Sequence, residues 1–472
     1  MTGEDESFEA VVAAVGERID PDERERERMR EAVAALTQRA EEAIADLPVA
    51  GDAMQVGSTA RGTWISGDRD IDLFVRFPAD VDREALESYG LEVGHAVLPE
   101  GREEYAEHPY VTGEFDGFDV DLVPCYRLDA ATEIQSAVDR TPFHNEYLNA
   151  RIDADLAGEV RLFKQFLKGI GAYGSDLRTR GFSGYLTELL VVEYGSFRAV
   201  VEAAADEWHP PVRFDPEDHG RARETAKPSR NEEVGDADLP FDDPLVVVDP
   251  TDPERNVAAV CAAENVARLQ HYARELLADP REELFFPDPT DPLSPEAVRD
   301  RVADRATTPV AVRFDAPDVV EDQLYPQLRK SLAGVRDELD RRGFDALRDA
   351  TFADESAVLL AELAVAERPA VERHEGPPVH VRQHAEGFFE KYADDPEAYG
   401  PFIDGDRYVV ERRREFETAA AFLESDALFD VALGVHVESA LADGYDVLVG
   451  EAVAQLADEF GAQLADYFDP EP

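Results

Sequence analysis

The chain has little positive charge and almost no lysine. Its 472 residues include 104 aspartate and glutamate residues but only 47 lysine and arginine residues, a formal net charge of -57 at pH 7. The lysines are Lys164, Lys168, Lys227, Lys330 and Lys391. The acidic residues are dispersed along the chain, which argues against a local acidic interaction segment. This composition predicts a halophilic host with a salt-rich cytosol, because the Debye length falls to about 3 Å at 1 M salt and self-repulsion is then screened.

Cysteines and long apolar runs are also scarce. The two cysteines, Cys125 and Cys261, give no disulfide framework, and no Cys/His spacing resembles a zinc site. No apolar run is long enough to span a bilayer, and the first ten residues lack the basic region and apolar core of a signal peptide. We therefore expect a cytoplasmic protein without a membrane segment. The length and the 44% hydrophobic content predict three or four domains with sizeable cores.

Aspartates alternate with apolar residues in the segment 70–75, DIDLFV. Positions i and i+2 of a strand point to the same face, so Asp70 and Asp72 are expected to project together from a half-buried strand. Two carboxylates this close repel each other unless a cation neutralises them, and carboxylate oxygens are preferred ligands of Mg²⁺. Gly57 and Ser58, just upstream, can offer backbone N–H groups and a hydroxyl to an anion such as a triphosphate.

A second acidic strand is predicted at 118–123, FDVDLV, and Pro124 is expected to end it. If this strand lies beside the first, Asp121 becomes a third carboxylate, as phosphoryl chemistry with two metal ions about 3.5–4 Å apart requires. The alternative is that both acidic pairs are solvated strand faces of a very acidic protein. The Gly-Ser turn and the two strands together favour a magnesium site for nucleotidyl transfer.

These motifs resemble the polymerase-beta-type nucleotidyltransferase superfamily, in which Gly-Ser, Asp-x-Asp and a third strand aspartate form the site. More narrowly, the chain resembles the archaeal, class I CCA-adding enzymes. The segments that carry this resemblance are 57–63 (GSTARGT), 121–126 (DLVPCY), 181–185 (GFSGY) and 249–259 (DPTDPERNVAA), with 376–379 (GPPV) and 400–402 (GPF) further on. The similarity runs over nearly the whole chain and is densest in the first 260 residues.

The resemblance implies which residues meet the substrates. Asp70 and Asp72 would hold the metal ions over the triphosphate, and Asp121 would help to ready the 3′-hydroxyl of the primer. Ser58, Arg61 and Lys164 would neutralise phosphate charge in the transition state. Further nucleotide contacts are implied for Gly57, Thr141, His144, Tyr173, Ser183, Tyr185 and Arg255.

Two of these residues are also candidates on their own chemistry. Lys164 and Lys168 fall one turn apart on a predicted helix at 155–168, away from its apolar stripe, and lysine offers a compact charge suited to phosphate. Arg255 keeps its charge and presents a planar fork that can read a base edge. The plainer alternatives are a solvated helix face for the lysines and a surface salt bridge for Arg255. Lone tyrosines such as Tyr173 and Tyr185 are more often core residues.

The predicted fold is a multidomain α+β arrangement. Residues 1–142 are expected to form a mixed-sheet nucleotidyltransferase catalytic domain, with a helix at 22–46, strands near 54–57, 70–77, 110–115 and 118–125, and a helix near 82–97. Residues 143–279 are expected to form a helical, nucleotide-binding central domain. It would contain an unstructured insertion near 209–243, a short strand at 246–248, and a helix from Asn256 to about Leu277.

The remaining chain is expected to hold two more domains. Residues 280–368 read as strand, helix, strand, helix, strand, strand, beginning with a strand at 283–286, in a small α+β domain similar to the RNA-recognition or ferredoxin-like fold of the family. Residues 369–472 are expected to be a mostly helical tail that reaches along tRNA, with helices at 384–394, 407–424, 428–442 and 447–467. Its densest basic cluster would lie on helix surface beside Glu411 and Glu415, and consists of Arg407, Arg412, Arg413 and Arg414.

The predicted function is template-independent addition of C, C and A to immature or damaged tRNA 3′ ends from CTP and ATP, with Mg²⁺ and release of pyrophosphate. One alternative is a related transferase that makes poly(A) or oligoadenylate. Another is a non-catalytic RNA-binding protein whose acids only solvate it in brine. The sequence leaves open the oligomeric state, a homodimer included, and how the pocket changes from C to A.

Overall fold

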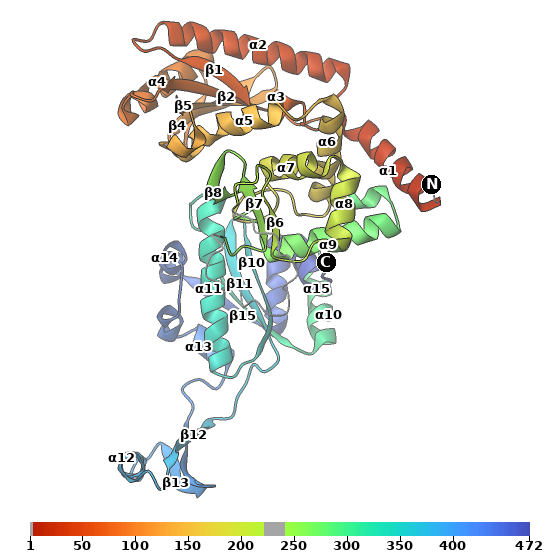
Figure 1. The fold of residues 1–472 in the computed structure, drawn as a ribbon. Helices are drawn as coiled ribbons and strands as arrows, with labels where there is room; N and C mark the ends of the chain where they lie inside the picture. The colour runs from red at the N-terminus through yellow and green to blue at the C-terminus, as the bar shows by residue number, and fades with distance from the viewer. Residues whose placement is uncertain (1–2, 221–240) are drawn as a thin grey trace. The chain divides into compact units, whose positions relative to one another are not determined.

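A computed structural model describes residues 3–220 and 241–472. It divides the chain into two compact units, Met1–Asp288 and Pro289–Pro472 (Figure 1). Most of the predicted insertion at 209–243 lies outside the described residues. At its start, Val212–Phe214 forms strand β6 and pairs with β7 (Leu245–Asp249), although the sequence pattern predicts no element there. No helix among the described residues is long and apolar enough to cross a membrane.

The first unit begins with a five-stranded mixed sheet in the order β1-β2-β5-β4-β3. Its strands are β1 (Asp52–Val56), β2 (Asp70–Pro78), β3 (Arg102–Tyr105), β4 (Pro109–Phe115) and β5 (Phe118–Arg127). Helices α2 (Glu23–Ala45) and α4 (Arg83–Val97) pack on one face. Residues such as Leu36, Val93, Leu73 and Leu122 form the buried core between them. Apart from β3, these elements confirm the predicted helices and strands of the catalytic sheet.

Strand β5 corrects one expectation, because it continues through Pro124 to Arg127. Strand β4 pairs with β5 only from Phe118 to Leu122, so Pro124 has a ladder partner on β2 alone, opposite Val75. A missing N–H therefore removes little pairing at this position, which is the edge-like setting that tolerates proline.

The rest of the first unit is mainly helical. Its helices are α1 (Gly3–Ile19), α3 (Gly57–Arg61), α5 (Thr141–Asn149), α6 (Ala154–Gly169), α7 (Gly184–Tyr194), α8 (Phe197–Asp206) and α9 (Ala263–Ala278). Helix α1, which the sequence pattern does not predict, places Phe8, Val15 and Ile19 in the core of the central helices. Strands β7 (Leu245–Asp249) and β8 (Asp252–Asn256) form a hairpin. The helix expected to start at Asn256 starts at Ala263 instead, so Arg255 lies on strand β8.

The second unit contains a four-stranded sheet in the order β10-β11-β9-β15. Its strands are β9 (Thr308–Asp315), β10 (Ala346–Ala353), β11 (Ser356–Leu363) and β15 (Tyr445–Val449). Its helices are α10 (Pro295–Arg305), α11 (Glu321–Arg341), α13 (Ala419–Leu423), α14 (Val435–Asp443) and α15 (Ala457–Phe468). The strand predicted at 283–286 is wrong, because Glu282–Leu284 forms a 3₁₀ turn in the first unit and the sheet takes its fourth strand from β15.

The helix predicted at 407–424 is also wrong over its first half. A separate sheet holds β12 (Val371–Pro378), β13 (Ala398–Asp404) and β14 (Arg407–Arg413), beside α12 (Arg382–Tyr392). Gly405, with φ at +64°, supplies the turn between β13 and β14, and the valines and tyrosine of β14 favour a strand. Arg412 and Arg414 pair with Glu372, and Arg413 pairs with Glu397, whereas Glu415 pairs with Arg342.

Candidate active site

Three predicted carboxylates lie on neighbouring strands of the catalytic sheet. Strands β2 and β5 are parallel, and Asp72 is in register with Asp121 just as Asp70 is with Asp119. The apolar residues between them point into the core, so all four aspartates share the opposite face. Asp70 and Asp119 are exposed at the strand starts, whereas Asp72 and Asp121 are half-buried one step further along.

The negative charges of these aspartates repel one another. Burial, together with the charges of Asp121 and Asp70, raises the pKa of Asp72 to about 6. Burial also raises the pKa of Asp121, with Glu104 and Asp70 adding to the effect, although a hydrogen bond with Thr112 lowers it. A site that raises carboxylate pKa values in this way favours a bound cation.

The donor set fits a hard divalent cation, because it consists of carboxylate oxygens that repel one another. Within residues 3–220 and 241–472, however, no three His, Cys, Asp or Glu side chains are gathered closely enough to hold a metal ion as they stand. The three aspartates thus provide the chemistry of a metal site without the closed arrangement of one.

Gly57 lies directly against Asp72 at the end of β1. Val56 pairs with Asp72 in the β1–β2 ladder, and Gly57 then turns the chain into α3 with φ at +77°. A Cβ atom at Gly57 would lie 2.2 Å from Oδ2 of Asp72. Only glycine therefore allows both this turn and the observed position of the carboxylate.

Arg61, predicted to neutralise phosphate, is occupied by other partners in this structure. Its guanidinium donates to the carboxylate of Glu188 on α7, with Nη2–Oε2 at 2.7 Å, and to Oδ1 of Asn145 at 2.6 Å. The side chains of Arg61 and Glu188 are only 8% and 3% exposed. Thr63 also donates to Glu188, at 2.5 Å. Arg61 therefore ties the segment after Gly57-Ser58 to the central helices.

Lys164 and Lys168 meet at one carboxylate that precedes the acidic strand. Lys164 Nζ donates to Oδ2 of Asp68 at 2.6 Å, and Lys168 Nζ donates to Oδ1 at 3.3 Å. Both ammonium groups also lie 5.6 Å from the ring centre of Tyr173. Burial opposes ionisation of Asp68, but Lys164, the backbone N–H of Ile65 and Lys168 together outweigh it, and the pKa of Asp68 is lowered. The two ammonium groups are thus held at Asp68, which precedes Asp70 by two residues in the sequence.

His144, Tyr185 and Arg255 form a second cluster around Asp249. The rings of His144 and Tyr185 stack, with centroids 3.9 Å apart and planes at 13°. His144 Nε2 lies 2.7 Å from Oδ2 of Asp249, and Arg255 Nη1 lies 2.9 Å from the same oxygen. The hydroxyl of Tyr185 is buried without a hydrogen-bond partner, and burial raises the pKa of Tyr185.

The remaining predicted residues have local roles in the structure. Ser183 caps helix α7, where its hydroxyl accepts from the N–H of Leu186 at 3.1 Å. Thr141 is the first residue of α5, the helix that carries His144, and Ser58 is the second residue of α3. The nucleotide contacts predicted for Ser183, Thr141 and Ser58 therefore stay predictions.

Three acidic residues of these clusters were not predicted as site residues: Asp68, Glu188 and Asp249. Each lies far in sequence from the basic residue that it binds, apart from Asp249 and Arg255. For two of them the sequence offers a signal in the neighbouring motifs. Asp68 precedes Asp70, and Asp249 opens the segment 249–259. Pairing of this kind depends on tertiary neighbours and cannot be read from periodicity.

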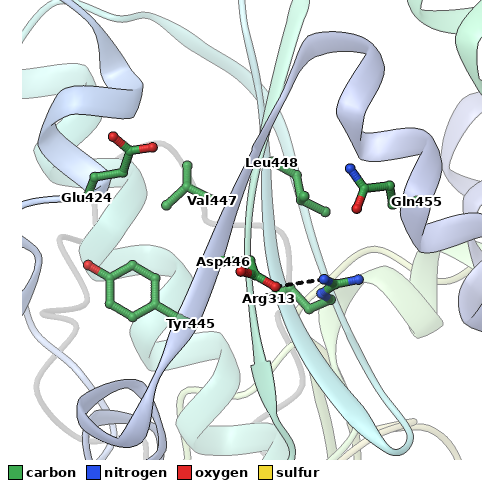
Figure 2. Close-up of a pocket in the computed structure, with 7 residues that line it drawn as sticks. All are labelled: Arg313, Glu424, Tyr445, Asp446, Val447, Leu448 and Gln455. Carbon is green, nitrogen blue, oxygen red and sulfur yellow. Dashed lines mark hydrogen bonds and ion pairs between the residues drawn. The ribbon is translucent and has the colours of Figure 1, made fainter.

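A cavity of about 520 Å³ lies in the second unit beside β15. Figure 2 shows its lining, in which Arg313 pairs with Asp446 at 2.7 Å. The other lining residues are Glu424, Tyr445, Val447, Leu448 and Gln455. None of them is a predicted site residue, and the cavity lacks the paired carboxylates and glycine turn of β2 and β5. We therefore place the candidate active site on the catalytic sheet.

Known protein families match three successive parts of the chain. A nucleotidyltransferase domain matches residues 39–144, and the second domain of tRNA nucleotidyltransferase matches residues 158–286. The C-terminal domain of CCA-adding enzyme matches residues 305–450. The first of these matches contains Asp70, Asp72 and Asp121.

Whole-length relatives agree with these matches. The chain is 62% identical to a CCA-adding enzyme of Haloarcula marismortui, covering 99% of this chain and 100% of the relative. It is 39% identical to a CCA-adding enzyme of Methanosarcina barkeri, covering 95% of each. A solved structure of a cytoplasmic RNA terminal U-transferase is 15% identical, with a TM-score of 0.44 over 59% of this chain and 98% of that one. The chain therefore belongs to the archaeal CCA-adding enzymes of the nucleotidyltransferase superfamily.

Proposed function

We propose that this protein adds C, C and A without a template to the 3′ end of tRNA, from CTP and ATP, and releases pyrophosphate. The observation that carries the proposal is the shared face of β2 and β5, where Asp72 and Asp121 lie in register beside Asp70. The family membership supplies the substrate class. Because the reaction uses no template, we propose that the enzyme also repairs damaged tRNA 3′ ends.

Asp70, Asp72 and Asp121 are the residues that would hold Mg²⁺, in a two-metal arrangement. When bound, the ions would neutralise triphosphate charge and lower the barrier to attack by the 3′-hydroxyl. Asp121 is proposed to accept the proton of that hydroxyl on its carboxylate.

The phosphate groups are proposed to contact Ser58 and Lys164, with Arg61 holding α3 in place through Glu188. Lys164 is held by Asp68, two residues before Asp70 in the sequence, until a more highly charged triphosphate competes for it. The base and sugar are proposed to meet Thr141, His144, Tyr173, Ser183, Tyr185 and Arg255. The stacked rings and the partly exposed guanidinium of the second cluster support this part of the proposal.

We also propose a catalytic domain at 1–142, a central domain at 143–279, and one α+β body built from the two expected domains 280–368 and 369–472, of which the last would contact tRNA. The order β9, α11, β10, β11, α14, β15 and the antiparallel pairing of β9 with its neighbours support a ferredoxin-like body. The sheet β12-β14-β13 would then be an insertion in that body, and part of the proposed tail would complete it.

The proposal is tested by incubating purified protein in high KCl with tRNA lacking its terminal CCA and with each labelled nucleotide separately. On tRNA that lacks its whole CCA, we expect CMP to be incorporated from CTP alone. We expect AMP to be incorporated only when two C residues are already present at the 3′ end. Long runs of A would favour the poly(A) alternative, and no incorporation would favour the non-catalytic RNA-binding alternative.

Gly57→Ala is expected to lower kcat/KM for both CTP and ATP by about a hundredfold, because the new methyl group displaces the carboxylate of Asp72. The matched control is Gly62→Ala at the other end of α3. Its φ is +70°, yet no atom lies within 4 Å of the new Cβ. Both variants carry left-handed strain of roughly 1–2 kcal/mol, which melting measures. Steady-state kinetics should then separate them, because only Gly57→Ala displaces the carboxylate of Asp72. Equal activity losses would mean that strain alone matters.

Lys164→Ala is expected to weaken the use of CTP and ATP alike, because phosphate contacts carry no base information. Arg255→Ala should instead raise misincorporation of UTP and GTP relative to CTP. The measurement is kcat/KM for all four nucleotides with each variant. Indistinguishable profiles for the two variants would refute this division of roles.

A further inference from the structure

Asp249 joins residues from distant parts of the first unit at one carboxylate. It ends strand β7, and its side chain is fully buried. Oδ1 accepts from the backbone N–H of Thr251 at 2.9 Å and from its hydroxyl at 2.8 Å. Oδ2 lies 2.7 Å from His144 Nε2 and 2.9 Å from Arg255 Nη1. Both oxygens are therefore occupied, and the carboxylate is held in one orientation.

The two side chains that contact Oδ2 of Asp249 differ in how accessible they remain. His144 is held against Tyr185 by stacking, whereas Arg255 remains 35% exposed. A guanidinium has five N–H donors in a planar fork, and Asp249 engages only one of its terminal nitrogens. A fork anchored on one side presents its remaining donors in a defined plane.

We propose that Asp249 is a positioning residue for base selection, which fixes the guanidinium of Arg255 in the geometry that accepts the incoming base. This inference rests on the proposed function and adds to it a residue that does not itself touch the nucleotide. Its physical basis is that a donor fork discriminates between bases only while its direction is fixed.

Replacement of Asp249 by asparagine changes this anchor selectively. The amide oxygen can still accept from the N–H and hydroxyl of Thr251. The amide nitrogen then faces Arg255, and two donors cannot form a hydrogen bond. Asp249→Asn should therefore release Arg255 while retaining the local turn.

The experiment measures kcat/KM for CTP and for UTP on tRNA that lacks its terminal CCA. For Asp249→Asn we expect the CTP/UTP ratio to fall by roughly tenfold, the lower range for loss of one oriented base contact. The matched control is Asp252→Asn. Asp252 is also buried, accepts from a backbone N–H two residues on, and binds an arginine, Arg140, at 3.1 Å. Its ratio should stay within about twofold of wild type.

A double variant separates positioning from general damage. If Asp249 acts through Arg255, Asp249→Asn combined with Arg255→Ala should discriminate no worse than Arg255→Ala alone. Additive losses, an unchanged ratio in Asp249→Asn, or an equal loss in Asp252→Asn would each overturn the inference, while CCA addition by the wild type would leave the proposed function standing. Failure of the wild type to add CCA would instead remove the proposed function and this inference with it.

A milder variant covers failure of Asp249→Asn to fold. Thr251→Val removes the hydroxyl that orients Asp249 and leaves its charge in place. It should lower the CTP/UTP ratio in the same direction but by less, and an unchanged ratio in this variant would overturn the inference.

Discussion

Asp72→Asn and Asp121→Asn are each expected to lower the rate of both C and A addition by at least about a thousandfold. Each removes a carboxylate that would hold the metal ions, and metal-ion charge stabilisation contributes several kcal/mol to phosphoryl transfer. Both variants should remain folded, because these side chains lie on the polar face of the sheet and outside its apolar core.

Asp72→Asn should also stabilise the metal-free protein. The pKa of Asp72 is raised to about 6, so the folded state favours its protonated form. Stability from this group is therefore complete below the ordinary carboxyl pKa near 4 and is lost as the pH rises through 6. The difference corresponds to at most about 3 kcal/mol at neutral pH. Asp72→Asn should melt at a higher temperature than the wild type at pH 8, and the two should converge near pH 4.

Asp119→Asn is the matched control, since Asp119 occupies the same face of β5 but is exposed at the start of the strand. It should retain most activity, and divalent cations should raise its melting temperature as they do for the wild type. Asp72→Asn should show a much smaller rise. Loss of activity in Asp119→Asn equal to that in Asp121→Asn would show that the wrong acid was assigned to the site.

Binding of tRNA is expected to persist in molar KCl, and dilution of the salt should abolish activity through unfolding. A chain with a formal charge of -57 repels a polyanion, and release of counterions contributes little when the bulk salt is already molar. Affinity must then come from hydrogen bonds, shape and local arginines. The exposed arginines of β14 are paired with Glu372 and Glu397, and high salt weakens such surface pairs.

Circular dichroism and tRNA binding measured together across a KCl titration test this expectation. From 3 M down to 1 M KCl, we expect the dissociation constant to change by less than about tenfold, whereas a protein with 6–10 phosphate contacts loses about 10³–10⁵ in affinity over a similar fold-range of salt. Below that range, loss of ellipticity should accompany loss of binding. Steady tightening with an intact fold would show that ordinary electrostatic recognition dominates.

The sequence predicted the catalytic sheet well because its signals are local. Alternation at 70–75 and 118–123 placed the aspartates on one face, and the apolar stripe of α2 located the helix that covers the other face. The parallel register of Asp72 with Asp121 is a tertiary property, and alternation alone does not determine it.

Other features depend on turn residues or on partners that are distant in the sequence. Asp404-Gly405-Asp406 is a typical hairpin turn, and it favours β13 and β14 over the helix predicted at 407–424. Conversely, no local pattern reveals that Glu188 binds Arg61 or that Asp68 binds two lysines, because these ion pairs join segments about a hundred residues apart.

The central claim is most directly tested by extending three tRNA substrates that end before CCA, after the first C and after the second C. Each is incubated with all four nucleotides in molar KCl, and the added residues are sequenced. We expect CCA on the first substrate, CA on the second and a single A on the third, with no further addition, and none of these products with Asp72→Asn. Continued addition of one nucleotide on all three substrates, or addition that survives in Asp72→Asn, would contradict it.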